Sequence, residues 1–293
     1  MTVLRSFLFA PGNHPRRVEK SLTLGADAVI LDLEDAVANA EKAATRAIVV
    51  EALGRPRHCR GYVRVNSLGT QWSHGDFVAV VAPGVDGIVL PKVESAADLQ
   101  TGEWLLAALE RERGLPEGAI DLVPIIETAA GYCNIAEITR AARRTRRLAF
   151  GAGDFTLDLG LTWSAGESEL LPYRSTLIAH SRAAGLEPPI DTVWVSLADR
   201  EGFARSVQLA KDLGFQGKLC IHPDQVPVVN ACFAPSDQEL SHARRVLDAF
   251  AQAERDGLAA IQVDGQFVDY PIVYRAQRLI ERADAITQAA RPH

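Results

Sequence analysis

Short apolar runs alternate with longer amphipathic stretches along most of this chain. Most of the runs are continuously apolar rather than alternating, which is typical of parallel strands covered on both faces. They occur in this order: Ser6–Ala10, Ala28–Leu33, Tyr62–Asn66, Gly87–Pro91, Leu122–Glu127, Leu148–Gly151, Thr192–Leu197 and Lys218–His222. The stretches between them carry helical signals, of which Glu94–Glu112 and Tyr132–Ala142 are examples.

Eight strand–helix units within about 230 residues match the number and length of an α/β TIM (β/α)8 barrel. An open, doubly wound sheet is the alternative architecture. No G-x-G-x-x-G follows the first apolar run, which disfavours a dinucleotide-binding sheet. We therefore expect a barrel whose functional groups lie at the carboxyl ends of its strands.

The last part of the chain has a different pattern. Ser236 and Glu239 have the spacing of a capping box that begins a helix. Two short β-rich runs flank the tight-turn pair Asp264-Gly265, and Pro271 begins a final helix at a position where proline is tolerated. The predicted division is a catalytic barrel over residues 1–234 and a helical and hairpin extension over residues 235–293.

Composition and charge narrow the class of protein. The chain has 293 residues, 47% of them hydrophobic, and a formal net charge of −6, which argues against a general nucleic-acid binder. No apolar stretch approaches membrane-spanning length. The four cysteines form no C-x-x-C pair, which is typical of reduced thiols. We expect a cytoplasmic protein that binds neither nucleic acid nor a membrane.

The order of strands and basic residues separates two groups of cations. In a barrel, residues just after a strand lie on the catalytic face, and residues just before one lie on the opposite face. Arg16, Arg17 and Lys20 follow the first strand, where they suit either a phosphate-bearing ligand or the exposed side of a helix. On the opposite face, we expect a solvated helix end at the basic run Arg140, Arg143, Arg144, Arg146 and Arg147.

Arg64 lies inside a predicted strand, where charge is rare. It must either point into the barrel mouth or have a buried partner. Recognition of a carboxylate or carbonyl by the guanidinium fork is its natural task. The acids Asp32, Glu34 and Asp35 leave the second strand, and we expect one or two of them to be partners of Arg64 or of metal-bound water, with a surface role equally open to Asp35.

Three further polar residues follow strands or lie near them. Lys92 suits a Schiff-base lysine, but an ion pair with a strand-end acid is the preferred interpretation. His222 suits an acid/base group, although a structural hydrogen bond is favoured. Asp158 is interpreted as the cap of a following segment.

Glu127 and Asp154 each leave a hydrophobic strand, and they carry the main functional hypothesis. Burying an acid against apolar neighbours is costly unless something pairs with it. No lysine or arginine lies within several residues of either acid, and Gly151-Ala152-Gly153 lets backbone approach a ligand closely. Because only oxygen ligands are available, we expect the pair to bind Mg²⁺; neutralisation by a nearby cation is the alternative.

Sequence motifs at the strand ends and in the extension resemble those of the citrate lyase β-subunit-like lyases. This group includes malyl-CoA and citramalyl-CoA lyases and belongs to the HpcH/HpaI aldolase superfamily. The resemblance covers nearly the whole chain in the expected order. It rests on Ser6–Gly12, Asp32–Val37, Val63–Asn66, Leu90–Glu94, Ile126–Thr128, Gly151–Asp154, Ile221–Gln225 and Gly265–Pro271.

The resemblance implies a carbon–carbon lyase that depends on Mg²⁺, or on Mn²⁺ in its place. Its substrate would be a 3-hydroxyacyl-CoA thioester such as malyl-, citramalyl- or citryl-CoA, split into a 2-oxo acid and acetyl-CoA. Glu127 and Asp154 would hold the metal, and Arg64 would bind the substrate. Phe9, Arg16 and Lys20 would fall in the thioester-side pocket, where relatives often have tyrosine in place of Phe9 and some have lysine in place of Arg16.

The resemblance also implies a shared site. In relatives with the G-x-x-[IV]-D-x-P stretch, the extension reaches an adjacent subunit of a trimer, and its acid serves as acid/base. We therefore expect a homotrimer in which Asp269 completes a neighbour's site; capping of the last helix is the simpler role of this residue. Relatives also include thioesterases and subunits that work with an acyl-carrier protein, so a thioesterase and a non-catalytic CoA-ester-binding subunit are the alternative functions.

Overall fold

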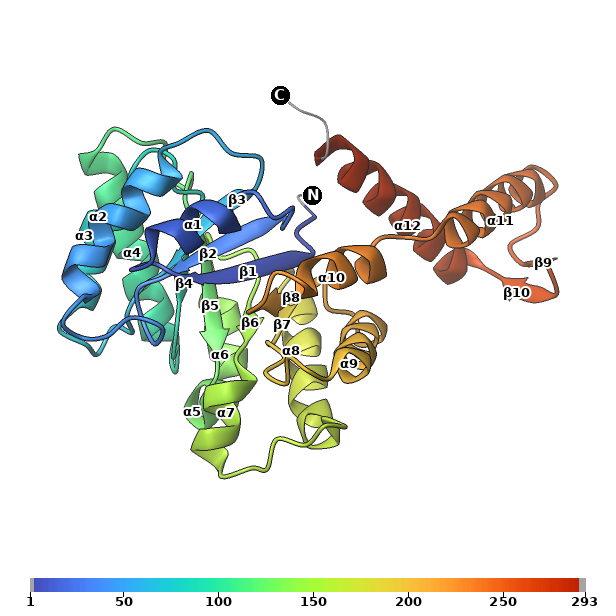
Figure 1. Cartoon of the computed structure of the whole chain (residues 1–293). Coiled ribbons are helices and arrows are strands. Elements are labelled where there is room, and N and C mark those ends of the chain that lie inside the picture. The colour runs from blue at the N-terminus through green and yellow to red at the C-terminus, as the bar shows by residue number, and fades with distance from the viewer. Residues whose placement is uncertain (1–2, 290–293) are drawn as a thin grey trace. The chain divides into compact units, whose positions relative to one another are not determined.

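Eight parallel strands close into a barrel in the computed structural model, which describes residues 3–289 (Figure 1). Each strand pairs with the next, and β1 closes the ring by pairing with β8. The predicted TIM barrel is therefore confirmed. The strands are β1 (Ser6–Pro11), β2 (Ala28–Asp32), β3 (Arg60–Arg64), β4 (Gly87–Leu90), β5 (Asp121–Ile126), β6 (Ala149–Phe150), β7 (Ile190–Asp191) and β8 (Gly217–Cys220).

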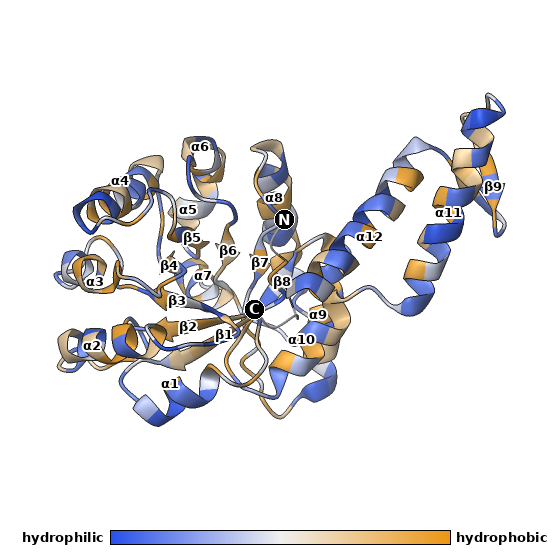
Figure 2. Ribbon diagram, turned by 90° about the horizontal axis from the view of Figure 1, so that it is seen from above, coloured by the Kyte–Doolittle hydropathy of each residue, from blue (hydrophilic) through white to orange (hydrophobic). Residues whose placement is uncertain are grey.

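Helices surround the barrel, and Figure 2 shows their outer faces as largely hydrophilic around a hydrophobic ring of strands. They are α1 (Pro15–Ser21), α2 (Lys42–Leu53), α3 (Ser73–Val80), α4 (Ala96–Glu112), α5 (Ala129–Cys133), α6 (Ile135–Ala141), α7 (Ala152–Leu159), η1 (Ser168–Leu170), α8 (Leu171–Ala183), α9 (Arg200–Leu213) and α10 (Gln225–Phe233). Every strand is thus covered on its outer side, which explains why the runs are continuously apolar.

The barrel interior is filled by side chains from all eight strands. Phe7 and Tyr62 meet edge to face, with ring centroids 5.6 Å apart. Each such side chain stabilises the fold by about 1.5–3 kcal/mol through burial. The rest of this core comprises Leu4, Ala28, Ile30, Val89, Val123, Ile125, Ala149, Ile190 and Leu219. The interior is therefore a packed core rather than a channel, and a site must lie at its rim.

The seventh strand lies earlier than its apolar run predicts. The run Thr192–Leu197 is not a strand; β7 is the short pair Ile190–Asp191 that precedes it. The side chain of Asp191 is fully buried and pairs with Arg174 (Nε–Oδ1 2.8 Å) and with Lys218. Acid and base neutralise one another here, between the strands and α8.

The basic run before β6 is also different from the prediction. Arg147 is buried and pairs with Glu187 and, at 3.4 Å, with Asp121. Arg144 pairs with Glu110, whose carboxylate is itself buried. The expectation of a solvated helix end is wrong for these two arginines, because both are held by acids at the foot of the barrel.

The chain divides into two compact units, Leu4–Asn230 and a second one that contains Val3 and the chain from Ala231. The second unit contains α11 (Asp237–Arg255), β9 (Ile261–Val263), β10 (Gln266–Val268) and α12 (Tyr270–Ala289). The predicted domains also include residues 1–2 and 290–293, which lie outside the described part of the chain.

The extension folds as its local pattern predicts. Ser236 accepts a hydrogen bond from the Glu239 N–H, and Glu239 returns one to the Ser236 N–H, so the capping box is present. β9 and β10 pair antiparallel across Asp264 (φ 51°) and Gly265 (φ 79°). Positive φ at both central residues gives the turn twist that suits a hairpin. None of the helices among residues 3–289 has the length and apolar character of a membrane span.

Candidate active site

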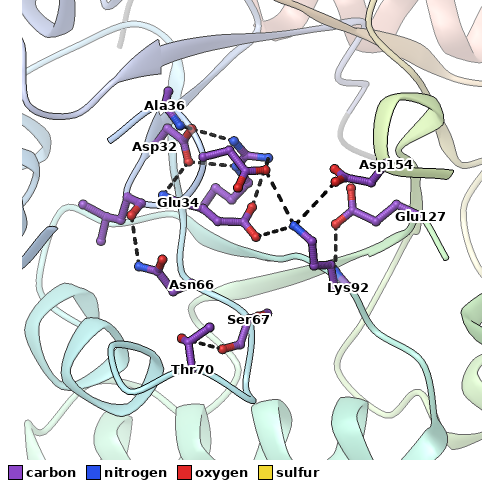
Figure 3. Close-up of polar contacts among 12 residues, drawn as sticks. Asp32, Glu34, Ala36, Asn66, Ser67, Thr70, Lys92, Glu127 and Asp154 are labelled. Atoms are coloured by element: carbon purple, nitrogen blue, oxygen red, sulfur yellow. Dashed lines mark hydrogen bonds and ion pairs between the residues drawn. The ribbon is translucent and has the colours of Figure 1, made fainter. Parts of the chain in front are cut away.

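Charged side chains from neighbouring strands meet at the carboxyl end of the barrel (Figure 3). Neighbouring strands from β2 to β6 end within two residues of each other in their pairing, so the residues that follow them are brought to the same rim. The predicted group assembles here from β2, β3, β4, β5 and β6. Its members are Asp32, Glu34, Asp35, Arg64, Lys92, Glu127 and Asp154.

Arg64 ends β3 and is held by a bidentate ion pair. Its Nε and Nη2 donate to the two oxygens of Asp32, at 2.8 and 2.6 Å. Its Nη1 lies 3.1 Å from Glu34 Oε2, and its guanidinium lies 4.9 Å from the ring centre of Phe9. Burial would raise the pKa of Asp32, but Arg64 and the backbone amides of the loop hold it below its usual value. Arg64 thus faces the mouth and has buried partners.

A buried lysine fixes the loop that carries Glu34. Lys42 is the first residue of α2, and its Nζ donates to the carbonyls of Leu33 (3.1 Å) and Glu34 (2.6 Å) and to Asn66 Oδ1 (2.7 Å). The nitrogen also lies 5.3 Å from the ring centre of Trp72. Sequence reasoning missed Lys42. A cation in the first turn of a helix interacts unfavourably with the helix dipole, so its presence there indicates a specific role. This signal could have identified Lys42.

Lys92 links the two halves of the charged group. Its ammonium lies 2.7 Å from Glu34 Oε1 and 3.8 Å from Asp154 Oδ1. Its backbone N–H donates to Glu127 Oε1 at 2.8 Å. The preferred ion-pair interpretation of Lys92 agrees with these contacts. No cation lies close to Glu127 and Asp154 in the sequence, but the pairing of β4 with β5 brings Lys92 to them, so a nearby cation, the stated alternative, is present.

Glu127 is almost fully buried at the end of β5. Burial, with the nearby charges of Glu34 and Asp154, raises its pKa to about 8. Its neighbour Gly151 leaves no room for a side chain, since an added Cβ would lie 2.4 Å from Glu127 Oε2. The first glycine after β6 therefore accommodates Glu127 itself rather than a ligand.

The group has the charge expected of a cation site. Its five carboxyl groups outnumber the two cations in direct contact with them, Arg64 and Lys92. Within residues 3–289, no cluster of three or more His, Cys, Asp or Glu side chains is arranged to ligate a metal. Mg²⁺ commonly keeps several waters and uses only one or two protein carboxylates. Glu127 and Asp154 therefore fit Mg²⁺ better than a metal that needs a complete protein cage.

The remaining predicted site residues lie in different places. Phe9 is near the end of β1 and contacts Arg64, whereas Arg16 and Lys20 are exposed on α1, which follows β1.

Asp269 lies between β10 and α12, and its carbonyl accepts from the N–H groups of Ile272 and Val273 as a helix cap does. Within the described residues, its carboxylate makes no hydrogen bond. It belongs to the second compact unit.

Two other polar residues have local structural contacts. His222 Nδ1 accepts a hydrogen bond from the Asp224 N–H at 3.2 Å, which matches the favoured structural interpretation. Asp158 lies in α7 and accepts from the Ala129 N–H at 2.7 Å. Ala129 is the first residue of the earlier helix α5, so the predicted cap of the segment that follows Asp158 is wrong. Neither contact places these residues in the charged group.

The fold and the site together define a barrel enzyme family, and sequence comparison identifies which one. Residues 5–223 match the model of the HpcH/HpaI aldolase/citrate lyase family, and residues 178–286 match that of the C–C bond lyases of the TIM-barrel fold. The chain belongs to the HpcH/HpaI aldolase/citrate lyase family.

Individual relatives include proteins with different activities. The chain is 40% identical to citrate lyase subunit beta of Leuconostoc mesenteroides subsp. cremoris, over 96% of this chain and 93% of that protein. It is 36% identical to the (3S)-malyl-CoA thioesterase of Cereibacter sphaeroides, over 96% and 95%. The structure of CitE from Mycobacterium tuberculosis, in complex with magnesium, acetoacetate and coenzyme A, superposes with a TM-score of 0.78 at 33% identity, covering 96% and 98%.

Proposed function

We propose that the protein is a Mg²⁺-dependent lyase that cleaves a 3-hydroxyacyl-CoA thioester into a 2-oxo acid and acetyl-CoA, or forms it by the reverse Claisen-type condensation. The observation that carries this proposal is the meeting of Arg64, Glu127 and Asp154 at one rim. A strand-held guanidinium beside two acids provides a place for a substrate carboxylate and a place for a divalent cation.

Glu127 and Asp154 would hold the metal cation, because carboxyl groups outnumber positively charged side chains in this part of the rim. When bound there, Mg²⁺, or Mn²⁺ in its place, supplies Lewis acidity and a template for the substrate oxygens. The M. tuberculosis CitE complex, which contains magnesium, supports this assignment. Burial of Glu127 and its hydrogen bond from the Lys92 N–H fix one carboxylate before any ligand binds.

Arg64 would bind the carboxylate and the oxygen that becomes the 2-oxo group. Asp32 holds Nε and Nη2 of Arg64, so the guanidinium cannot rotate, and Nη1 is the nitrogen that faces the remaining acids. Cleavage breaks the bond between the thioester α-carbon and the hydroxyl-bearing carbon. The electron pair moves to the α-carbon, and Arg64 offsets negative charge that develops on the substrate oxygens.

Two proton movements must accompany this cleavage. The hydroxyl proton leaves as the C=O bond forms, and the enolate carbon gains a proton to give acetyl-CoA. We assign the acid/base role near the thioester methyl to Asp269, because its carboxylate has no hydrogen bond within the described part of the chain. The extension of residues 235–293 would then complete the site of a neighbouring subunit in a homotrimer.

The thioester arm would lie near β1 and α1. Phe9 would contact the acyl end, because it already packs against Arg64. Arg16 and Lys20 are exposed cations on α1, the helix that follows β1, and suit the phosphates of coenzyme A. A thioester carried by an acyl-carrier protein has the same acyl end and a phosphopantetheine arm, so it is an alternative partner.

Two relatives favour specific alternatives. Similarity to the C. sphaeroides thioesterase favours hydrolysis of a malyl-CoA-like thioester, and similarity to a citrate lyase subunit favours a component of a larger complex. The deciding experiment incubates the protein with malyl-CoA, citramalyl-CoA and citryl-CoA, with and without Mg²⁺. A 2-oxo acid product supports the lyase, free CoA without one supports the thioesterase, and no turnover supports the non-catalytic subunit.

A further inference from the structure

We propose that Lys92 is a positioning residue with two opposed effects on the metal site: its backbone N–H fixes Glu127, and its ammonium weakens the binding of a dication. This inference rests on the proposed assignment of Glu127 and Asp154 as metal ligands. It concerns a residue outside that ligand pair and predicts how tightly the site holds its cation.

The backbone of Lys92 is in an unusual conformation. Its φ is +52°, in the left-handed region that glycine adopts readily and lysine rarely does. This conformation directs the N–H toward Glu127 Oε1, 2.8 Å away. Glycine would satisfy the same backbone geometry without strain. A lysine at this position therefore indicates a requirement for the side chain as well as for the N–H.

The Lys92 side chain contacts acids on both sides of the site. Its ammonium lies 2.7 Å from Glu34, 3.6 Å from Asp35 and 3.8 Å from Asp154. Glu34 is the acid that also faces Arg64, and Asp154 is a proposed metal ligand. A single positive charge is thus held between the substrate-binding arginine and the metal position.

A fixed ammonium near the proposed metal position has opposite effects in the metal-free and the metal-bound protein. Without metal, it offsets carboxylate repulsion and stabilises the folded site. With a dication bound, like charges a few ångströms apart repel, and the repulsion lowers the affinity. The ion pair with Glu34 prevents the ammonium from moving far away. Lys92 therefore keeps the site assembled when it is empty and keeps the bound cation exchangeable.

The experiment compares Mg²⁺ binding by full-length wild type, Lys92→Met and Lys92→Arg, using calorimetry at about pH 9, above the pKa of Glu127. Lys92→Met keeps the N–H and removes the charge, so its Kd should fall on the order of tenfold. Lys92→Arg keeps the charge and should bind as the wild type does. Mg²⁺ should also raise the Tm of Lys92→Met more than that of the other two proteins.

Two controls separate the possible failures. If wild type binds no Mg²⁺, or Glu127→Gln binds it as well as wild type, the metal assignment fails, and the Lys92 proposal fails with it. If wild type binds and Glu127→Gln does not, equal or weaker binding by Lys92→Met overturns the Lys92 proposal alone. Lys92→Gln serves as a second uncharged variant if circular dichroism shows that Lys92→Met is not folded.

Discussion

Arg64 binds Asp32 along one edge of its guanidinium, and its Nη1 lies on the other side, 3.1 Å from Glu34. This arrangement uses the planarity of the group, since two nitrogens bind one acid while a third contacts another. An ammonium has one nitrogen and cannot do both at once. The charge of residue 64 is therefore less important than its shape.

We expect Arg64→Lys to lower kcat/KM by at least about 100-fold, because misplacement of a positioned group by about 1 Å can cost that much. Steady-state kinetics on the substrate identified by the thioester panel measure the loss. Thermal unfolding of the variant provides the control for folding. A kcat/KM close to that of the wild type would show that Arg64 is structural.

We expect metal binding at the proposed site to depend on pH through Glu127. A protonated carboxyl group does not ligate Mg²⁺, and the pKa of Glu127 is raised to about 8 by burial and neighbouring acids. The apparent Kd for Mg²⁺ should therefore fall about tenfold per pH unit as the pH rises toward 8, and level off above it. Calorimetry across this range tests the prediction; a flat profile would contradict it.

The raised pKa of Glu127 also makes the stability of the metal-free protein depend on pH. The folded protein retains a proton on Glu127 that the unfolded chain loses near its ordinary pKa of 4.5. The contribution of this group to stability is therefore complete below about pH 4.5 and is lost as the pH rises to about 8. This direction is the reverse of that for a carboxylate with a lowered pKa, such as Asp32.

At the level of single residues, the sequence identified the members of the site more successfully than it identified the contacts among them. Glu127, Asp154 and Arg64 could be chosen because each combines charge with an apolar strand. The position of Lys92 between the acids depends on the pairing of neighbouring strands, which brings it to Glu34, 58 residues earlier in the chain. Lys42 has contacts mainly with carbonyl oxygens, and these leave no pattern of complementary charges in the sequence.

At the level of secondary structure, the start of α7 constrains the site. Gly151 precedes this helix, and a Cβ there would lie 2.4 Å from Glu127 Oε2 and 2.7 Å from Glu127 Cβ. Neither atom can yield easily, because Glu127 is buried and its carboxylate is hydrogen-bonded. At Gly153, two residues into α7, the nearest atom to an added Cβ is 4.0 Å away, on Trp163.

We expect Gly151→Ala to displace Glu127 and to reduce both Mg²⁺ affinity and kcat/KM by at least about tenfold. Gly153→Ala is the matched control, since it adds the same methyl group where there is space, and alanine favours the helix by roughly 0.5–1 kcal/mol. Calorimetry and kinetics on both variants make the comparison. Equal behaviour of the two would contradict the steric role of Gly151.

Comparison of the predicted and observed strands indicates which elements a sequence pattern can locate. Continuous apolar runs located seven strands to within about two residues, because a strand buried on both faces is apolar at nearly every position. The seventh run, Thr192–Leu197, failed because Val195 and Leu197 are 58% and 51% exposed beyond the strand. The strand itself contains Asp191, whose partners Arg174 and Lys218 lie on α8 and β8, 17 and 27 residues away. Local pattern contains no information about such pairing.

At the scale of the whole molecule, the extension is a compact unit with its own core. Val246, Phe250, Val268 and Val273 form part of it, and Phe250 packs edge to face on Tyr270 at 5.1 Å. Phe267 remains 67% exposed on β10, two residues before Asp269. Among the described residues, the Asp269 carboxylate makes no hydrogen bond, and an exposed aromatic side chain two positions before it suits contact with another protein surface.

A complementation experiment tests whether Asp269 acts on a neighbouring chain. Glu127→Gln and Asp269→Ala should each be inactive alone, and mixing them under conditions that exchange subunits should restore activity. In a ring, each site would combine the barrel of one chain with the Asp269 of the next. In an equal, random mixture, about one site in four pairs an intact barrel with an intact Asp269, so about a quarter of wild-type activity should return. Mass spectrometry of isotope-labelled subunits confirms that exchange has occurred. If exchange is complete and activity does not recover, Asp269 serves its own chain or none, and a fully active monomer would exclude the shared site altogether.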